Sequence, residues 1–197
     1  MASSPPAAAR IIGLTGRAGA GKDTAFRLLS AATPGIRFQR RAFADLLKES
    51  AMLAIGLDPE DADDFKTRGR ITVWYGADRA HELTGREYFQ RYGMEAHREV
   101  FGDDFWMKRV LHPDVLAQNG VIFITDVRLD NEAEAIKALG GEVWRIQRDG
   151  ATITEADHKT EAGVSDELID RSIYNTGSLP ELEVMMSEAF GAVACRL

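Results

Sequence analysis

A glycine-rich segment that ends in a lysine is the part of the sequence whose residue types most directly predict chemistry. Residues 16–22 read GRAGAGK and follow an apolar run that ends at Thr15. Glycines let backbone amides approach phosphate oxygens, a helix N-terminus adds its positive end, and a lysine supplies a point charge to the β- and γ-phosphates. A strand before this pattern and a helix after it are the context in which it binds a nucleotide. We therefore predict a nucleotide-phosphate site at Gly16, Gly19, Gly21 and Lys22.

The residue after Lys22 departs from the usual pattern. A Ser or Thr at this position commonly holds Mg²⁺, whereas this chain has Asp23, followed by Thr24. Asp23 either binds Mg²⁺, directly or through water, or satisfies amides in the first turn of the helix. Both alternatives stay open at this point.

A second carboxylate follows a run that is apolar on both faces of a strand. Residues 121–125 read VIFIT, and Asp126 and Arg128 come directly afterwards. Open α/β sheets bind their ligands at the carboxyl ends of the strands. We predict that Asp126 organises Mg²⁺, in preference to capping a helix, because the next helix is expected to begin at Asp130. Arg128 is predicted to hold a phosphate, or else to pair with Asp126.

Arginine outnumbers lysine 18 to 6 in this chain. A guanidinium matches phosphate geometry bidentately, but genome base composition also explains such an excess. Arg148 directly follows a predicted strand, so we predict that it stabilises the transition state, with a plain strand-end charge as the alternative. Arg68, Arg70 and Arg79 crowd one short stretch, where they either bind phosphate or form a solvated surface.

Apolar, β-branched runs alternate with amphipathic stretches, which predicts βαβ units around a parallel sheet. The expected strands are residues 10–15, 36–43, 120–125, 142–147 and 168–174. The expected helices are residues 22–32, 45–55, 130–139 and 179–190, the last beginning with a capping box between Ser178 and Glu181. An insertion at residues 56–116 should contain two helices, around 86–100 and 103–116. Residues 149–164 are predicted to be a mobile loop.

Length and composition predict one domain over residues 10–197, preceded by a disordered tail at residues 1–9. Apolar residues make up 45% of the 197 residues, which is enough for one core. The net charge of −7 argues against a nucleic-acid partner and favours a small substrate. The single cysteine, Cys195, cannot form an internal disulfide. The sequence contains no run of 18 apolar residues, so no membrane partner is predicted. The oligomeric state stays open, a homodimer included.

Four separated blocks together resemble the phage-type deoxynucleoside monophosphate kinases. The blocks are residues 16–24, residues 86–106, residues 125–132, and residues 158–161 (HKTE) with 175–179 (NTGSL). The resemblance implies a P-loop NTPase fold: a three-layer α/β/α arrangement with a five-stranded parallel sheet, a helical substrate-binding insertion at residues 56–116 and a lid loop at residues 149–164. Residues 56–80 match nothing in the family residue by residue.

The resemblance also implies a reaction and its participants. ATP with Mg²⁺ is the implied donor, a deoxynucleoside monophosphate the acceptor, and a bacterial host cytoplasm the compartment. Arg17 is placed to contact both substrates, while Arg86, Gly93 and Trp106 match the monophosphate side, to which Arg68 is a further candidate. Taken without the resemblance, Trp106 would be interpreted as a core tryptophan. His158 and Glu161 match the family but have no assigned chemical role.

Three other functions stay open from the sequence. Another small-molecule kinase, resembling phosphomevalonate or dephospho-coenzyme A kinase, would share the loop and the acidic strand end. A GTPase switch would need an N-K-x-D guanine motif, which the chain lacks. A structural protein with an inactive loop is disfavoured because Lys22, Asp126 and the arginines are all present. His81, His97 and His112 have no metal-ligand spacing and are predicted to be structural or exposed.

Overall fold

The computed structural model describes residues 10–74, 79–116, 120–148 and 163–194. The chain divides into two compact units, one formed by residues 1–42 together with 111–197 and one formed by residues 43–110. Each unit is described separately. The predicted tail at residues 1–9 and all but the last two residues of the predicted loop at 149–164 lie outside the described residues. The prediction of a single domain with an insertion stays a prediction.

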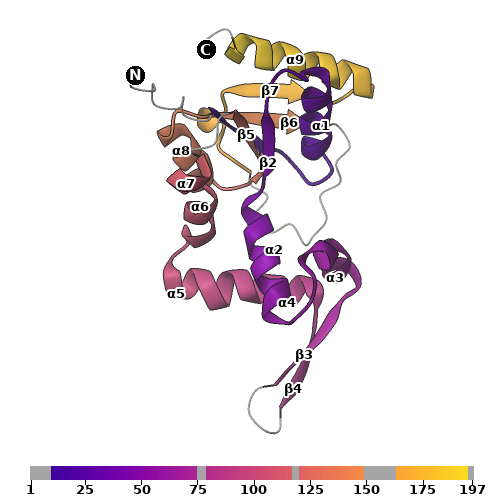
Figure 1. Cartoon of the computed structure of the whole chain (residues 1–197), viewed down its shortest axis with the longest axis vertical. Helices are drawn as coiled ribbons and strands as arrows, with labels where there is room; N and C mark the ends of the chain where they lie inside the picture. Colours follow the sequence, from indigo (N-terminus) through magenta and orange to yellow (C-terminus); the bar gives the residue numbers. More distant parts are fainter. Residues whose placement is uncertain (1–9, 75–78, 117–119, 149–162, 195–197) are drawn as a thin grey trace, which may run out of the picture. The chain divides into compact units, whose positions relative to one another are not determined.

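A five-stranded parallel sheet forms the centre of the first unit (Figure 1). In spatial order its strands are β2 (Phe38–Arg41), β5 (Val121–Val127), β1 (Arg10–Thr15), β6 (Glu142–Gln147) and β7 (Arg171–Tyr174). From β1 the chain moves outward to β2 on one side, returns through β5, and continues with β6 and β7 on the other side. Ligands of open α/β sheets bind at such a reversal, which here falls beside β1. The predicted α/β fold with a parallel sheet is confirmed.

Helices cover both faces of this sheet. On one face, α1 (Lys22–Ala32) and α9 (Leu179–Ala194) pack against one another and share a core with the strands, in which Leu14, Phe123 and Trp144 are fully buried. On the other face lies α8 (Asp130–Ala138), whose Ile136 packs so closely that a Cβ at Gly13 would come within 2.8 Å of its Cδ1. The unit therefore has three layers, visible in Figure 1 as α9 and α1 on one side of the sheet and α8 on the other.

Two predicted strands of the first unit are shorter than expected. The strand predicted at residues 36–43 is limited to Phe38–Arg41, because Phe43 already begins the next helix. The strand predicted at 168–174 starts only at Arg171, after a short 3-10 helix at Asp166–Leu168. Just before β7, Asp170 forms two hydrogen bonds with Val143: its backbone N–H donates to the Val143 carbonyl oxygen and its carboxylate accepts the Val143 N–H, both at 2.8 Å. A further short helix, α7 (Pro113–Leu116), completes the unit.

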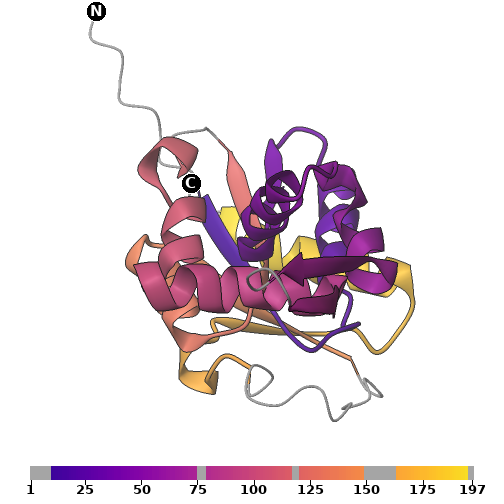
Figure 2. The same cartoon turned by 90° about the horizontal axis from the view of Figure 1, so that it is seen from below.

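The second unit is mainly helical. Its elements are α2 (Phe43–Ala54), a 3-10 helix (Pro59–Asp61), α3 (Ala62–Arg68), strands β3 (Arg70–Trp74) and β4 (Ala80–Thr84), α4 (Gly85–Gly93), a π-helical turn (Met94–Arg98), α5 (Glu99–Phe101) and α6 (Phe105–Val110). Ala51, Met52 and Phe89 are buried in its core, and Phe65 packs edge-on against Phe89 with ring centroids 5.7 Å apart. The helices, purple to magenta in the colour scale, can be followed in Figure 2.

The predicted helices of the insertion are only partly correct. The helix predicted around residues 86–100 is present as α4, the π-helical turn and α5, which follow one another without a break. The helix predicted around 103–116 is divided into α6 and α7, because the chain leaves the helix at Leu111 and His112 and Pro113 starts a new one. The antiparallel hairpin of β3 and β4 and the helix α3 were not predicted.

The start of α9 carries the Glu181 half of the capping box predicted from the sequence. The N–H and the hydroxyl of Ser178 donate to Oε2 of Glu181, at 2.6 and 2.9 Å. These two bonds stabilise the charged carboxylate and lower the pKa of Glu181. No helix in the described part of the chain is long and apolar enough to cross a bilayer.

Replacing Glu181 by Gln should weaken the start of α9, because a neutral amide oxygen accepts these two bonds less strongly than a carboxylate does. The pKa of Glu181 is lowered in the folded chain, so its stabilising effect is complete above the ordinary value of 4.5 and is lost as the pH falls through the lower folded value. We expect Glu181→Gln to lower the urea midpoint at pH 7, and the difference from the unaltered chain to shrink in acid. The exposed Glu188 on the same helix provides the control, Glu188→Gln. Equal midpoints for both variants at pH 7 would contradict this account.

Candidate active site

The loop between β1 and α1 lies so close to neighbouring strands that two of its positions require glycine. Gly16 has a φ of 141°, and a Cβ there would stand 2.2 Å from the carbonyl oxygen of Ile146 in β6. Gly21 has a φ of 96°, and a Cβ there would stand 2.6 Å from Nδ2 of Asn175. L-residues rarely adopt such φ values, so both backbone conformation and space exclude a side chain. The predicted phosphate loop therefore has the backbone that its sequence implies.

Lys22 lies with its ammonium group over its own loop. Its Nζ donates to the carbonyl oxygens of Gly16, at 2.7 Å, and Arg17, at 3.0 Å. These two carbonyl oxygens hold the Lys22 ammonium group close to the amides of the loop and to the first turn of α1. An anion that binds to these amides therefore meets the lysine directly.

Asn175, at the end of β7, supports the loop from beneath. Its side chain is buried, and Nδ2 donates to the carbonyl oxygen of Ala20 at 2.9 Å. Its backbone N–H donates to the carbonyl oxygen of Gln147 at 2.6 Å, which ties β7 to the end of β6. The family block at residues 175–179 therefore begins with a residue that fixes the shape of the phosphate loop.

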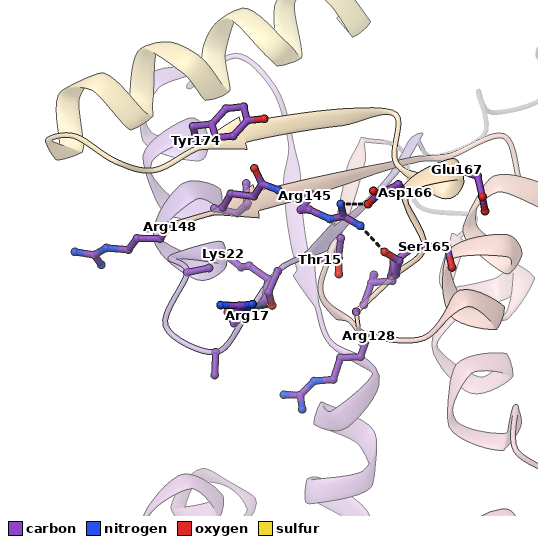
Figure 3. Close-up of a pocket in the computed structure, with 18 residues that line it drawn as sticks. Thr15, Arg17, Lys22, Arg128, Arg145, Arg148, Ser165, Asp166, Glu167 and Tyr174 are labelled. Carbon is purple, nitrogen blue, oxygen red and sulfur yellow. Dashed lines mark hydrogen bonds and ion pairs between the residues drawn. The ribbon is translucent and has the colours of Figure 1, made fainter. Parts of the chain in front are cut away.

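A pocket of about 790 Å³ opens beside this loop, within the range typical of small-molecule sites (Figure 3). Its cationic lining residues come from several elements: Arg17 and Lys22 from the loop and the first turn of α1, Arg128 from the end of β5, and Arg145 and Arg148 from β6 and its end. Arg17, Arg128 and Arg148 are exposed. The structure thus brings together four predicted residues, Lys22, Arg17, Arg128 and Arg148, from segments that are far apart in the sequence.

Arg145 was not predicted, and it fixes one wall of the pocket. Its guanidinium donates to the carboxylate of Asp166 and to the carbonyl oxygen of Val164, as Figure 3 shows for the contacts of this side chain. Asp130 fixes the same segment from α8, accepting the Ser165 N–H at 2.7 Å and the Ser165 hydroxyl at 2.6 Å. These two bonds lower the pKa of Asp130. The chain around residues 163–166 is therefore anchored from two sides.

The end of β5 places Asp126 next to a separately capped helix. The backbone N–H groups of Arg128 and Leu129 donate to Oε2 of Glu132, at 2.8 and 3.1 Å, and Glu132 is buried. Glu132 therefore satisfies the two N–H groups just before α8, which begins at Asp130 as predicted. Asp126 is half-buried at the carboxyl end of the strand. Its assignment to Mg²⁺ stays a prediction.

The two residues after the phosphate-loop lysine each contact an arginine. Oδ1 of Asp23 accepts a bond from Nε of Arg40 at 2.7 Å, and Oγ1 of Thr24 accepts one from Arg27 at 3.4 Å. Arg40 belongs to β2 and was not among the predicted site residues. Its position three residues before the end of the predicted strand at 36–43, close to the edge where ligands bind, was the available signal.

Four predicted substrate residues, Arg68, Arg86, Gly93 and Trp106, belong to the second unit. Trp106 is only 5% exposed, and its indole N–H donates to the carbonyl oxygen of Gly93 at 3.3 Å. Gly93 also permits close helix packing, since a Cβ there would lie 2.3 Å from Cδ1 of Leu47 in α2. Trp106 and Gly93 thus have definite packing roles, and their contact with a substrate stays a prediction.

The arginines of the second unit that were predicted as phosphate ligands, Arg68, Arg70, Arg79 and Arg86, are exposed. Arg68 pairs with Asp64 in α3, Arg70 pairs with Glu82 across the hairpin at 3.5 Å, and Arg86 is exposed in the first turn of α4. His97 lies among aromatic rings, 4.9 Å from the Trp106 ring and 4.5 Å from the Tyr92 ring.

His81 and His112 are exposed, as the sequence analysis predicted. His158 and Glu161 lie outside the described residues.

A parallel sheet whose strand order reverses beside a glycine-rich loop and its lysine is the architecture of the P-loop kinases, and the first unit is of that class. The family described as deoxynucleotide monophosphate kinase matches residues 69–186, which is more than half of the chain. The chain belongs to the deoxynucleotide monophosphate kinase family. It is therefore an ATP-dependent phosphotransferase.

Comparison with individual proteins gives the range of the similarity. A protein of Acanthamoeba polyphaga mimivirus, named as a deoxynucleotide monophosphate kinase, is 29% identical over 150 residues, which is 71% of this chain and 75% of that protein. The solved dephospho-CoA kinase from Campylobacter jejuni aligns with a TM-score of 0.48 and 14% identity, covering 93% of this chain and 96% of its own. Shikimate kinase from Aquifex aeolicus aligns with a TM-score of 0.40 and 18% identity, covering 93% and 98%. These two structural similarities are too distant to bear on the substrate.

The packing role of Gly93 can be separated from a substrate role by a double-mutant cycle with Leu47. We expect Gly93→Ala to reduce the free energy of unfolding by about 1–3 kcal/mol, because the added methyl overpacks the contact between α4 and α2. Leu47→Ala should also destabilise, but the double variant should lose less than the sum of the two, since each change relieves the other. Urea unfolding of all four proteins measures this coupling. Strict additivity would contradict the packing role, whereas restored stability with lost activity would add a role in substrate binding.

Proposed function

We propose that the chain transfers the γ-phosphoryl group of ATP to a deoxynucleoside 5′-monophosphate, giving the diphosphate and ADP. The observation that supports it most directly is the convergence of Lys22, Arg17, Arg128 and Arg148 on one pocket at the carboxyl edge of the sheet. Positive groups from three parts of the chain suit a site in which two phosphorylated molecules meet. Membership of the deoxynucleotide monophosphate kinase family supports the choice of acceptor.

Positioning and charge neutralisation would supply the catalysis. Phosphoryl transfer through a loose transition state needs little covalent chemistry from a protein. In this proposal the loop amides and Lys22 hold the β- and γ-phosphates, while Arg128 and Arg148 stabilise the charge that moves between donor and acceptor. Arg17, on the loop itself, contacts both substrates. The acceptor phosphate is already ionised at neutral pH, so its oxygen attacks in line without a general base.

The residues beside the loop suit a magnesium ion. Asp23 and Asp126 offer carboxylate oxygens, and the buried hydroxyl of Thr125, next to Asp126, has no hydrogen-bond partner in the described part of the chain. No group of three or more His, Cys, Asp or Glu side chains gathers among the described residues. Mg²⁺ is usually held by one or two carboxylates, waters and substrate phosphates, so this donor set fits it. When bound, the ion neutralises charge on the β- and γ-phosphates.

The acceptor side of the proposal rests on the second unit. Arg86 and Arg68 are exposed and carry the charge that a monophosphate needs. Trp106 and Gly93 are included from the family resemblance, through the backbone that they fix between α4 and α6. The proposal also includes action on small nucleotides, with no nucleic-acid or membrane partner. It further includes a bacterial cytoplasmic location and a homodimer.

The proposed reaction is tested by supplying possible acceptors one at a time. Purified chain with Mg²⁺ and ATP receives each of the four deoxynucleoside monophosphates, their ribose counterparts, mevalonate phosphate or dephospho-coenzyme A, and ADP release is compared with a sample that lacks an acceptor. We expect release that depends on one or more deoxynucleotides. Release that is indifferent to every acceptor would reject the kinase reaction in favour of a nucleotide switch.

Lys22→Ala should lower kcat by about 10²–10³, the usual cost of removing one group that stabilises transferring charge. Lys108→Ala is a matched control, because the Lys108 side chain is 71% exposed and pairs with Asp104 on the surface. The same ADP-release assay measures both variants. Equal activity in the two would exclude Lys22 from the reaction.

A further inference from the structure

The pair between Arg40 and Asp23 joins the edge strand of the sheet to the first turn of α1. Nε of Arg40 donates to Oδ1 of Asp23 at 2.7 Å. Arg40 is the third residue of β2, and Asp23 directly follows Lys22. The pair therefore stands beside the phosphate loop, although Arg40 is absent from the residues that line the pocket.

The strand fixes the side of the sheet on which Arg40 lies. Side chains alternate along a strand, so Arg40 shares a face with Phe38, two residues earlier. Phe38 packs against Phe123 and Phe190, with ring centroids 5.8 and 5.2 Å away, in the core that α1 and α9 cover. A rigid strand thus delivers the guanidinium to the face occupied by α1, where it meets Asp23.

Asp23 occupies the position at which a P-loop usually presents a hydroxyl to the metal that bridges the β- and γ-phosphates. A carboxylate there adds negative charge next to an anionic donor, so it needs a cation between itself and the phosphates. Arg40 is the cation that the structure places on this carboxylate. A hydrated Mg²⁺ on the donor would need the same oxygens.

The exposure of the pair makes an exchange of partners feasible. The side chains of Arg40 and Asp23 are 39% and 62% exposed. Exposed ion pairs contribute little to stability, so replacing one cation on Asp23 by another costs little. A guanidinium that leaves Asp23 remains next to the first turn of α1 and its phosphate loop, and an acceptor phosphate must approach this loop for in-line transfer.

We propose that Arg40 and the donor's Mg²⁺ compete for Asp23, and that the Arg40 guanidinium displaced by the metal binds the phosphate of the acceptor. This inference rests on the proposed function. It gives Asp23 and Arg40 one shared role, in which binding of the metal-loaded donor prepares the acceptor site. The exchange of partners in this one ion pair thereby makes the donor bind before the acceptor.

The test measures binding rather than turnover. Calorimetry follows the non-hydrolysable analogue AMP-PNP, with Mg²⁺ or with EDTA, and then each of the four deoxynucleoside monophosphates added to the Mg²⁺–AMP-PNP complex. Arg40→Gln is compared with Arg37→Gln, which removes the same charge from an exposed residue directly before the first residue of β2. We expect Arg40→Gln to strengthen AMP-PNP binding about threefold in Mg²⁺ but not in EDTA, and to weaken monophosphate binding about tenfold, a change worth one charge-assisted contact.

Either of two results for Arg40→Gln would overturn the inference. If this variant behaves as Arg37→Gln in both titrations, or if it weakens the binding of AMP-PNP in Mg²⁺ as well, Arg40 does not compete with the metal. Asp23→Asn provides an independent variant: it should abolish the advantage of Mg²⁺ over EDTA and let the monophosphate bind tightly without AMP-PNP. If the unaltered chain binds none of the four monophosphates, the proposed function fails together with the acceptor role of Arg40, while the AMP-PNP titrations still decide the competition for Asp23. Equal urea midpoints for the variants and the unaltered chain establish that each variant is folded.

Discussion

The close fit of the phosphate loop against the ends of β6 and β7 is the constraint on which the site depends. The carbonyl oxygen of Ile146 occupies the space that a side chain at Gly16 would need, and Asn175 is bonded to the carbonyl oxygen of Ala20. The parallel pairing of β1 with β6 sets Thr15 opposite Arg145. Because the loop follows β1 and Arg145 lies in β6, a register shift between these two strands would change the position of Lys22 relative to Arg145.

Much of the first unit could be predicted because its sequence is locally consistent. β1, α1 and β6 have the predicted bounds, since each is an apolar or amphipathic run with a clear start and end. The predictions of β2 and β7 were too long, because hydrophobicity does not reveal that Phe43 opens a helix or that a 3-10 helix at Asp166–Leu168 precedes β7. The hairpin was missed for a related reason: only Ile71 and Val73 mark the inner face of β3, too short a pattern to separate from a loop.

The site was predictable where residue type, motif and strand end coincided. Lys22, Arg17, Arg128 and Arg148 met these conditions, and they line one pocket. Arg145 and Arg40 belong to no motif in a chain with 18 arginines. The nearness of Arg40 to a predicted strand end was a signal, but the carboxylate that each of the two reaches across the fold is known only from the structure. Trp106 was predicted as a substrate residue from the resemblance alone. In the structure its side chain is buried and its indole N–H is hydrogen-bonded, so it also has a packing role.

The anchoring of Val164 and Ser165 affects how this family can diversify. Arg148 and Gly163 both line the same pocket, so the chain between them leaves and returns at one place. Arg145 and Asp130 fix the returning end independently of what precedes it. For a connection whose two ends are held together, each doubling of length costs only about 0.6 kcal/mol in closure entropy. Insertions and deletions can therefore accumulate there during evolution without disturbing the sheet, the phosphate loop or its lysine.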